Sequence, residues 1–230
     1  MDREHRPQKQ EEKERRVLVV TSVDTERDAI LRGMGEMGDK NQVEVHTAGV
    51  GVARATAATA LALSAASYDL VVSAGIAGGF PGQAEVGSLV LASEIVAADL
   101  GAETAEGFCR LDELGLGPVC IHMDASLVKR LESSLRLRGL DVKTGPILTV
   151  STVTGSKETA DELAVRIPGA AAEGMEGFGV ATAAQLKGIP VLEMRAVSNF
   201  VGPRNRSAWR IDKALEVLEK ASGGLMEVII

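Results

Sequence analysis

The chain has 230 residues, of which 45% are hydrophobic and 25% are charged, a composition typical of a globular protein that buries a sizeable core. Its formal net charge is −7, which argues against a nucleic-acid-binding protein, because such proteins normally carry a basic patch or stripe. No apolar run reaches the ~18 residues that a transmembrane helix needs, and the N-terminus has no apolar signal-peptide core, so we expect a cytoplasmic protein without a membrane partner.

Residues 1–16 form a mixed-charge tail with no apolar residue after Met1. Because such a segment cannot bury apolar surface, we expect it to be disordered or loosely helical, and we assign residues 17–230 to a single domain. The two cysteines, Cys109 and Cys120, match no metal-binding spacing, and the three histidines are equally scattered. We therefore predict reduced thiols and no metal site.

Strands and helices are predicted to alternate along the chain. The β-branched run Val17–Val20 is typical of a strand buried on both faces, and the apolar spacing within Ser126–Arg138 is typical of a helix. The predicted strands are 17–20, 43–47, 69–73, a run within 86–96, 147–150 and 191–197, and the predicted helices are 25–37, 52–66, 126–138, 173–187 and 207–221. This order predicts an α/β fold, a single-domain three-layer α/β/α sandwich around a mixed central sheet.

Polar residues gather where predicted strands end. The turn Gly174–Gly177 carries Glu176 and opens a helix of small residues, and the next strand delivers Arg195, Ser198 and Asn199 to its C-terminal end. Ligands of open α/β sheets bind at the carboxyl ends of strands, so we expect these side chains to converge on one cleft.

Two glycine-containing turns follow predicted strands. The turn Gly75-Ile76-Ala77-Gly78-Gly79 allows backbone N–H groups to approach a ligand closely, although a turn without a ligand is the simpler alternative. The turn Gly49-Val50-Gly51, followed by Arg54, lacks the third glycine of a dinucleotide-binding fingerprint. A tight strand-to-helix turn explains this motif as well as a ligand-binding role does.

Two glutamates are candidates for chemistry. Glu26 follows the first strand by a short loop, where a carboxylate can activate water. On local sequence alone an ordinary acid in the first turn of a helix is the better interpretation, and Asp24 competes for the role. Glu176 lies in an otherwise apolar run, where a buried charge needs partners such as two sugar hydroxyls, and its alternative is an exposed acid at a helix start.

Arg195 lies on a strand that is predicted to be buried, so its guanidinium should be paired. A salt bridge with Glu193 is not expected, since residues two apart face the same side of a strand but splay along it.

Residues 173–209 resemble the nucleosidase branch of the nucleoside phosphorylase superfamily. That family carries a Met-Glu motif that opens a helix and an Arg-Ala-x-Ser-Asp or Arg-Ala-x-Ser-Asn motif that ends the next strand. Here the motifs read Met175-Glu176 and Arg195-Ala196-Val197-Ser198-Asn199. The segment Gly202–Trp209 is similar to the futalosine hydrolases in particular, which act in an alternative menaquinone pathway. The resemblance extends from Val17 to the C-terminus and implies a fold like that of the nucleoside phosphorylases and hydrolases.

The resemblance also implies roles for single residues. Glu26 matches the catalytic glutamate of the family, and Arg195 helps to hold the attacking water or anion. Glu176 binds ribose hydroxyls while Met175 packs against the sugar, and Ser198 is expected beside the substrate.

Comparison with the family at the turn Gly75–Gly79 and at Asn199 then indicates which reaction to expect. In the family, Ile76, Ala77 and Gly78 lie under the ribose and the attacking group. Many relatives have Ser or Thr at the second position, so Ile76 weakens a phosphate site and favours water as the nucleophile. Asn199 stands where adenine-releasing nucleosidases have Asp; an amide has no acidic proton but carries donors that suit a 6-oxopurine such as hypoxanthine.

The sequence therefore predicts an N-ribosyl hydrolase that releases hypoxanthine from futalosine and requires no cofactor. The alternatives are a methylthioadenosine or adenosylhomocysteine nucleosidase, disfavoured by Asn199, and a purine nucleoside phosphorylase, disfavoured by Ile76. A nucleoside-binding module without catalysis is the alternative from another class, and the coexistence of Glu26, Glu176 and Asn199 argues against it. Family members are mostly homo-oligomers, so we expect one, a dimer first.

The benzoate group of futalosine needs a cation. Arg204 and Arg206 follow the Asn199 motif, and we expect one of them to pair with that carboxylate. Both arginines are equally well explained as solvated charges ahead of the last helix, and Arg54 is a rival. For Trp209, helix packing under the C-terminal lobe explains the residue at least as well as a contact with the substrate does.

Overall fold

In a computed structural model of the protein, residues 15–35 and 42–229 are described. The predicted disordered tail covers residues 1–16, of which residues 1–14 lie outside the described part of the chain. Arg16, which we assigned to the tail, contacts Tyr68 and Glu44 beside the first strand. Within the described ranges, no helix is long and apolar enough to cross a membrane.

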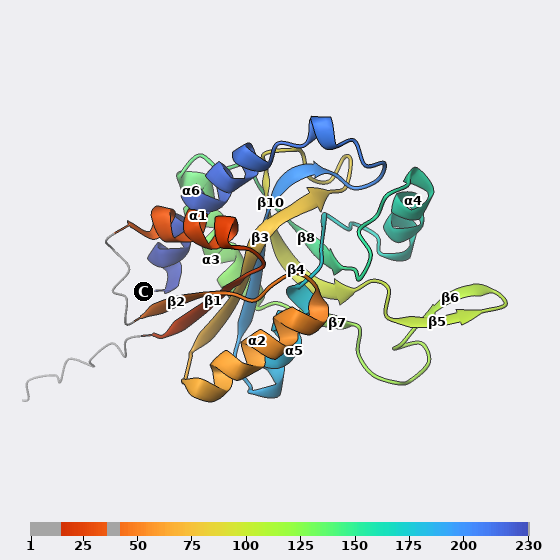
Figure 1. Cartoon of the computed structure of the whole chain (residues 1–230), viewed down its shortest axis with the longest axis horizontal. Coiled ribbons are helices and arrows are strands. Elements are labelled where there is room, and N and C mark those ends of the chain that lie inside the picture. The colour runs from red at the N-terminus through yellow and green to blue at the C-terminus, as the bar shows by residue number, and fades with distance from the viewer. Residues whose placement is uncertain (1–14, 36–41, 230) are drawn as a thin grey trace, which may run out of the picture.

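The core of the fold is one mixed sheet (Figure 1). Its strands are β1 (Val17–Thr21), β2 (Val43–Thr47), β3 (Leu70–Gly79), β4 (Leu89–Ala97), β7 (Cys120–His122), β8 (Val142–Thr149), β9 (Ala172–Gly174) and β10 (Val191–Phe200). β3 pairs with β1, β9 and β10, while β10 also pairs with β4, which continues through β8 to β9. Five strands therefore close into a ring, and β1 and β2 extend it from β3.

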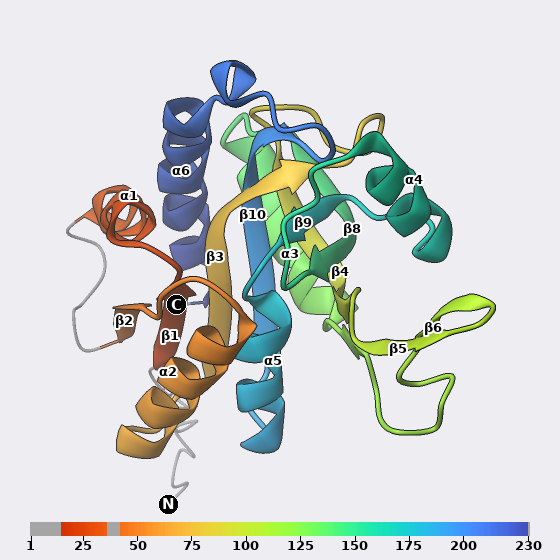
Figure 2. The same cartoon turned by 45° about the vertical axis from the view of Figure 1, so that its right-hand side comes forward.

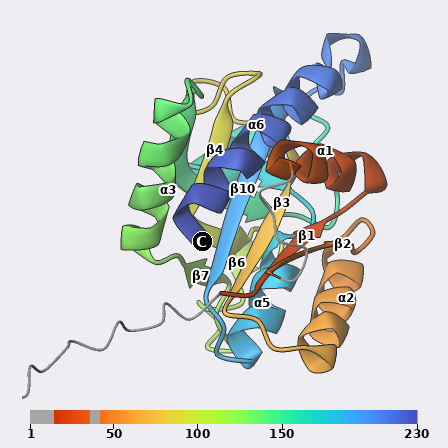
Figure 3. The same ribbon diagram turned by 90° about the vertical axis from the view of Figure 1, so that its left-hand side faces the viewer.

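Helices cover the sheet on two sides (Figures 1 and 3). α1 (Asp24–Met34), α3 (Ala125–Leu137) and α6 (Ile211–Ile229) pack together on one side, and α2 (Val52–Ala65) packs against α5 (Gly177–Leu186) on the other. α4 (Lys157–Arg166) lies apart from both groups, and the hairpin of β5 (Gly101–Thr104) and β6 (Gly107–Arg110) projects from the body (Figure 2). The predicted three-layer α/β/α sandwich with a mixed sheet is confirmed.

Burial explains why these segments form strands. All five residues of β1 are buried, as are eight of the ten residues of β3 and of β10. Strands covered by helices on both faces need such continuous apolar runs. At one helix contact only glycine fits, because a Cβ at Gly33 in α1 would lie 1.8 Å from the carbonyl oxygen of Glu219 in α6.

The structure corrects several predicted boundaries. The glycine run Gly75–Gly79 is the end of β3 and not a loop. The helix predicted over 173–187 is the strand β9, a turn and then α5, and the helix predicted over 207–221 is a short 3-10 turn followed by α6. The elements α4, β5, β6, β7 and β9 were not predicted, since short strands and a polar helix give weak periodic signals.

Candidate active site

A cavity of about 360 Å³ opens where the carboxyl ends of β3 and β10 meet α1 and the start of α5. This edge of the sheet is where open α/β folds bind ligands, and the volume is typical of small-molecule sites. Nine residues predicted for the site line the cavity: Glu26, Ile76, Ala77, Gly78, Met175, Glu176, Ser198, Asn199 and Arg204. Arg195 and Arg206 were also predicted, and they are not among its lining residues.

Glu26 is held by two elements at once. It is the third residue of α1 and only 3% exposed. Its Oε2 accepts hydrogen bonds from the backbone N–H groups of Ser22 at 2.9 Å and Val23 at 3.2 Å, which caps the helix start. Its Oε1 accepts a third bond, at 2.9 Å, from the N–H of Ile76 on β3. A carboxylate offers about four lone-pair sites, so Oε1 keeps one for a ligand.

The Glu26 carboxylate and the Arg195 guanidinium lie over the same face of Gly75, in the space that a side chain at this position would fill. A Cβ at position 75 would lie 2.7 Å from both Glu26 Oε1 and Arg195 Nη1. Only glycine therefore leaves room for the carboxylate and the guanidinium to approach each other over this strand.

Glu176 is the residue that precedes α5, and it is 6% exposed. Its Oε1 accepts a hydrogen bond from the N–H of Gly51 at 3.1 Å, and its Oε2 lies 3.3 Å from both the N–H nitrogen of Met175 and Arg195 Nη1. The side chain is thus buried and partnered, which excludes an exposed acid at a helix start. The turn before α2 helps to hold Glu176 through the N–H group of Gly51. Arg54, in the same region, is exposed and does not line the cavity.

Arg195 is 1% exposed and forms the centre of a buried ion cluster. Its Nε lies 2.8 Å from Glu193 Oε1, its Nη1 lies 3.3 Å from Glu176 Oε2, and its Nη2 donates to the hydroxyl of Ser73 at 3.2 Å. Burial alone would lower the pKa of Arg195, but the charges of Glu193, Glu176 and Glu26 raise it above its ordinary value. The guanidinium is therefore charged.

The prediction that Arg195 does not pair with Glu193 is wrong. Both side chains point to the same face of β10, and the long arginine side chain bends along the strand to reach the carboxylate. Both charges are buried, so leaving either unpaired would cost several kcal/mol.

Glu193 was not a predicted site residue, although it shares a strand with Arg195. Its Oε2 has no hydrogen-bond partner among the described residues, and a Cβ at Gly177 would lie 2.2 Å from it. Burial raises the pKa of Glu193 despite the opposing effect of Arg195. The first residue of α5 rests directly on this carboxylate, so Glu193 links Arg195 to the helix that follows Glu176.

Asn199 reaches the cavity through a break in register. The pairing of β10 with β3 shifts between Val197 and Asn199, and such bulges commonly re-aim side chains beside active sites. The Asn199 Nδ2 donates to the carbonyl oxygen of Phe200 at 2.9 Å, and its Oδ1 accepts from the hydroxyl of Ser198 at 2.8 Å. These partners set the orientation of the amide and leave one N–H hydrogen free.

The loop after β10 forms the rim. Arg204 lies over the ring of Trp209, with its guanidinium carbon 5.2 Å from the ring centre, and both residues line the cavity. Arg206 begins a 3-10 turn, is exposed and does not line the cavity. The structure thus distinguishes two arginines that the sequence left equivalent.

Glu173 is a lining residue that we did not predict. It is 5% exposed and accepts hydrogen bonds from the N–H of Thr154 at 2.9 Å and from the Thr154 hydroxyl. Burial raises its pKa, although the bonds from Thr154 oppose the rise. The signal was available, because Glu173 precedes the Gly-Met-Glu-Gly turn in an apolar stretch.

Comparisons with known proteins agree with this geometry. Residues 16–230 match the model of the phosphorylase superfamily. The chain is 50% identical to a futalosine hydrolase of Streptomyces coelicolor, over 93% of this chain and 96% of the relative. The chain belongs to the futalosine hydrolase family of the phosphorylase superfamily. A futalosine hydrolase of Acidothermus cellulolyticus is 44% identical, over 90% of this chain and 89% of the relative.

Solved structures show the same fold. A mutant of the 5'-methylthioadenosine/S-adenosylhomocysteine nucleosidase of Helicobacter pylori, with 5'-methylthioadenosine in its active site, superposes with a TM-score of 0.78. The match covers 94% of this chain and 98% of that chain at 21% identity. A futalosine hydrolase of the same organism gives a TM-score of 0.77 at 20% identity, over 94% of this chain and 97% of that chain.

The raised pKa of Glu173 predicts how stability depends on pH. Its usual value is 4.5, and a raised value in the folded protein means that folding favours the protonated carboxyl. That contribution is fully present below the unfolded pKa and is lost as the pH rises through the folded pKa. The variant Glu173→Gln mimics the protonated acid and keeps a partner for each Thr154 group. We expect its melting temperature, relative to wild type, to be higher at pH 8 than at pH 5.

The matched control is Glu216→Gln, which changes an exposed glutamate on α6. Its melting temperature relative to wild type should be the same at both pH values. A Glu173→Gln difference that stays constant or falls between pH 5 and pH 8 contradicts the prediction.

Proposed function

We propose that this protein hydrolyses the N-ribosidic bond of futalosine and releases hypoxanthine and dehypoxanthine futalosine, a step of menaquinone biosynthesis. One observation carries the proposal: Glu26, Glu176 and Asn199, from three separate elements, line a single cavity. The names of its relatives, which are futalosine hydrolases, support the choice of substrate.

Glu26 is the proposed general base. Its free lone pair on Oε1 accepts the proton of a water molecule whose oxygen bonds to the anomeric carbon. The bond from that carbon to the base nitrogen breaks, and the ribose passes through an oxocarbenium-like state. Three backbone N–H groups fix the carboxylate, so it needs no reorganisation when the water attacks.

Glu176 is the proposed anchor for the ribose. Gly51, Met175 and Arg195 occupy part of its hydrogen-bonding capacity, which leaves Oε1 able to accept from a ribose hydroxyl. Arg195 does not line the cavity, so we revise its proposed role from a catalytic residue to a positioning residue that orients Glu176. Met175 lines the cavity next to Glu176 and is proposed to pack against the sugar.

Asn199 is the proposed contact to the base. Its free N–H hydrogen can bond to N7 or O6 of hypoxanthine, where negative charge develops as the base departs. The departing hypoxanthine then takes a proton from solvent, and Glu26 returns to solvent the proton that it took from the attacking water. Ile76, Ala77 and Gly78 form the floor beneath the substrate, and Ile76 contributes its backbone N–H and not a hydroxyl. A cavity floor without a Ser or Thr hydroxyl at position 76 favours water over phosphate as the nucleophile.

We propose in addition that the enzyme is cytoplasmic, works without a cofactor and forms a homo-oligomer, with a dimer as the first candidate. These points rest on the sequence features and on the resemblance to the family. A methylthioadenosine or adenosylhomocysteine nucleosidase is the second candidate, because several relatives with 24–30% identity carry that name. The amide of Asn199 is the feature that separates the two.

The proposal is tested by incubating the purified chain with futalosine in buffers with and without phosphate. We expect hypoxanthine at the same rate in both. A requirement for phosphate would indicate a phosphorylase, and a higher kcat/KM for methylthioadenosine would indicate the second candidate. Binding of futalosine without turnover would indicate a nucleoside-binding module.

Glu26→Gln should lower kcat by about 10²-fold or more, within the range for loss of a general base. All three groups that face the Glu26 carboxylate are N–H donors, so the NH₂ group of the new glutamine side chain would face one of them without an acceptor. Thermal unfolding should therefore be measured alongside kcat. The matched control is Asp24→Asn, an exposed neighbour that pairs with Arg27 and should keep its turnover. Loss of turnover in Asp24→Asn but not in Glu26→Gln would move the base to Asp24.

Asn199→Asp should shift the preference from 6-oxopurine to 6-aminopurine nucleosides. An ionised carboxylate repels O6 but accepts from an exocyclic amine, and mismatched buried polar groups discriminate by up to ~10⁴-fold. The measurement is the ratio of kcat/KM for futalosine to that for its 6-amino analogue. Asn205→Asp, on the nearby loop, is the control and should leave the ratio unchanged. If the ratio is also unchanged in Asn199→Asp, this residue does not read the base.

Arg204→Ala should raise the KM for futalosine by about 10- to 100-fold, the size expected for a hydrogen bond between charged groups. Arg204 lines the cavity and Arg206 does not, so Arg206→Ala is a control matched in charge and exposure. Hydrolysis of inosine, which lacks the benzoate, should be unaffected by either change. An unchanged KM in Arg204→Ala would remove this rim from benzoate recognition and make Arg54 the next candidate.

A further inference from the structure

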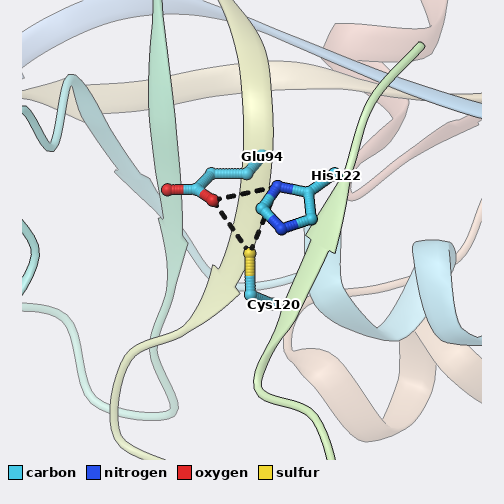
Figure 4. Close-up of side chains that lie close together, drawn as sticks. All are labelled: Glu94, Cys120 and His122. Carbon is cyan, nitrogen blue, oxygen red and sulfur yellow. Dashed lines mark hydrogen bonds and ion pairs between the residues drawn. The ribbon is translucent and has the colours of Figure 1, made fainter.

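Away from the cavity, three side chains with metal-binding atoms meet on β4 and β7 (Figure 4). Glu94 Oε2 lies 3.0 Å from Cys120 Sγ and 3.2 Å from His122 Nδ1, and the sulfur lies 4.0 Å from the same nitrogen. None of the three residues lines the proposed active site.

The backbone builds this cluster. β4 and β7 are antiparallel, with Glu94 directly opposite His122, and Cys120 precedes His122 by two residues. Residues two apart on a strand face the same side, and directly opposed residues are close neighbours. The register of the sheet therefore brings the three side chains to one face.

We propose that Glu94, Cys120 and His122 bind one Zn²⁺ ion and leave its fourth position open to water. Tetrahedral zinc, with a Zn–S bond of about 2.3 Å and Zn–N and Zn–O bonds of about 2.0–2.1 Å, places ligand atoms about 3.3–3.6 Å apart. The observed separations of 3.0, 3.2 and 4.0 Å differ from that range by about half an ångström at most. Small side-chain rotations are enough to complete the site.

Charge also favours the ion. When Zn²⁺ binds, a Zn–S bond replaces the S–H bond of Cys120 and the proton leaves to solvent. A thiolate, a carboxylate and a neutral imidazole then balance the two positive charges. Arg110 and Asp112 lie nearby but pair with each other at 2.6 Å.

Two other places in the chain carry only part of this ligand set. Cys109 lies 3.5 Å from Glu113 and has no histidine partner there, while His46 lies 3.3 Å from Glu44 without a thiol. Within residues 15–35 and 42–229, the strands β4 and β7 hold the one group of three such ligands. These two incomplete pairs serve as internal controls.

The proposal departs from the sequence prediction of no metal site. Spacing rules examine ligands that are close in sequence, whereas Glu94 is 26 residues from Cys120 and joins it through strand pairing. β7 has three residues and pairs with β4 alone among the described strands, so a metal ion would fix a short edge strand to the sheet.

The test is titration of the full-length, metal-free protein with Zn²⁺, followed by Co²⁺ as a spectroscopic substitute. We expect one ion per chain, with a thiolate-to-cobalt charge-transfer band. Cys120→Ser and His122→Ala should each weaken Zn²⁺ binding by at least about tenfold, since even changes outside the ligand shell cost 10- to 100-fold. Cys120→Ser should also abolish the charge-transfer band.

Cys109→Ser and His46→Ala should bind Zn²⁺ as the wild type does, and circular dichroism checks that each variant folds. Absence of stoichiometric binding, or equal loss of binding in Cys109→Ser and Cys120→Ser, would overturn the proposal. The cobalt spectrum of the unmodified protein decides even if a variant unfolds, because a bound ion without a thiolate band places the metal elsewhere.

Discussion

A buried positive charge holds the active site together. Arg195 contacts Glu193 and Glu176 directly and lies near Glu26 over one face of Gly75. One guanidinium therefore offsets the charges of three carboxylates that are each at most 6% exposed. A single buried carboxylate without a partner costs several kcal/mol. Arg195 therefore makes it possible for Glu26, the proposed base, and Glu176, the proposed ribose anchor, to be buried close together.

The same crowding explains which glycines surround the cluster. A Cβ at Gly75 would lie 2.7 Å from Arg195, one at Gly174 would lie 3.3 Å from it, and one at Gly177 would lie 2.2 Å from Glu193. These glycines do not act through a flexible backbone. They leave space for charged side chains, and Gly75 does so within a regular strand.

The sequence predicted half of the residues that line the cavity, nine of eighteen, and few of the contacts that support them. Glu176 and Asn199 were candidates because one lies at the start of a helix and the other at the end of a strand, where local patterns are informative. Glu26 was singled out by the resemblance to the family, because on local sequence alone an ordinary first-turn acid was the better interpretation. The Arg195–Glu193 pair and the Glu94–Cys120–His122 cluster depend on how side chains bend and on which strands pair. Such contacts join residues that are distant in sequence or splayed along one strand, so composition and periodicity carry no signal for them. The closure of five strands into a ring is hidden for the same reason.

The residues proposed for bond cleavage and the residue proposed for substrate recognition differ in how firmly the fold holds them. The groups proposed for bond cleavage are fixed by backbone partners: Glu26 by three N–H groups, and Asn199 by the carbonyl of Phe200. That carbonyl is an acceptor, and the amide of Asn199 supplies it with a hydrogen at neutral pH without carrying an acidic proton. Arg204, the residue proposed to recognise the far end of the substrate, lies instead on an exposed loop and packs over the ring of Trp209. The groups proposed for cleavage and the group proposed for recognition lie on separate elements, so a change in the rim loop can alter substrate recognition without moving Glu26 or Asn199.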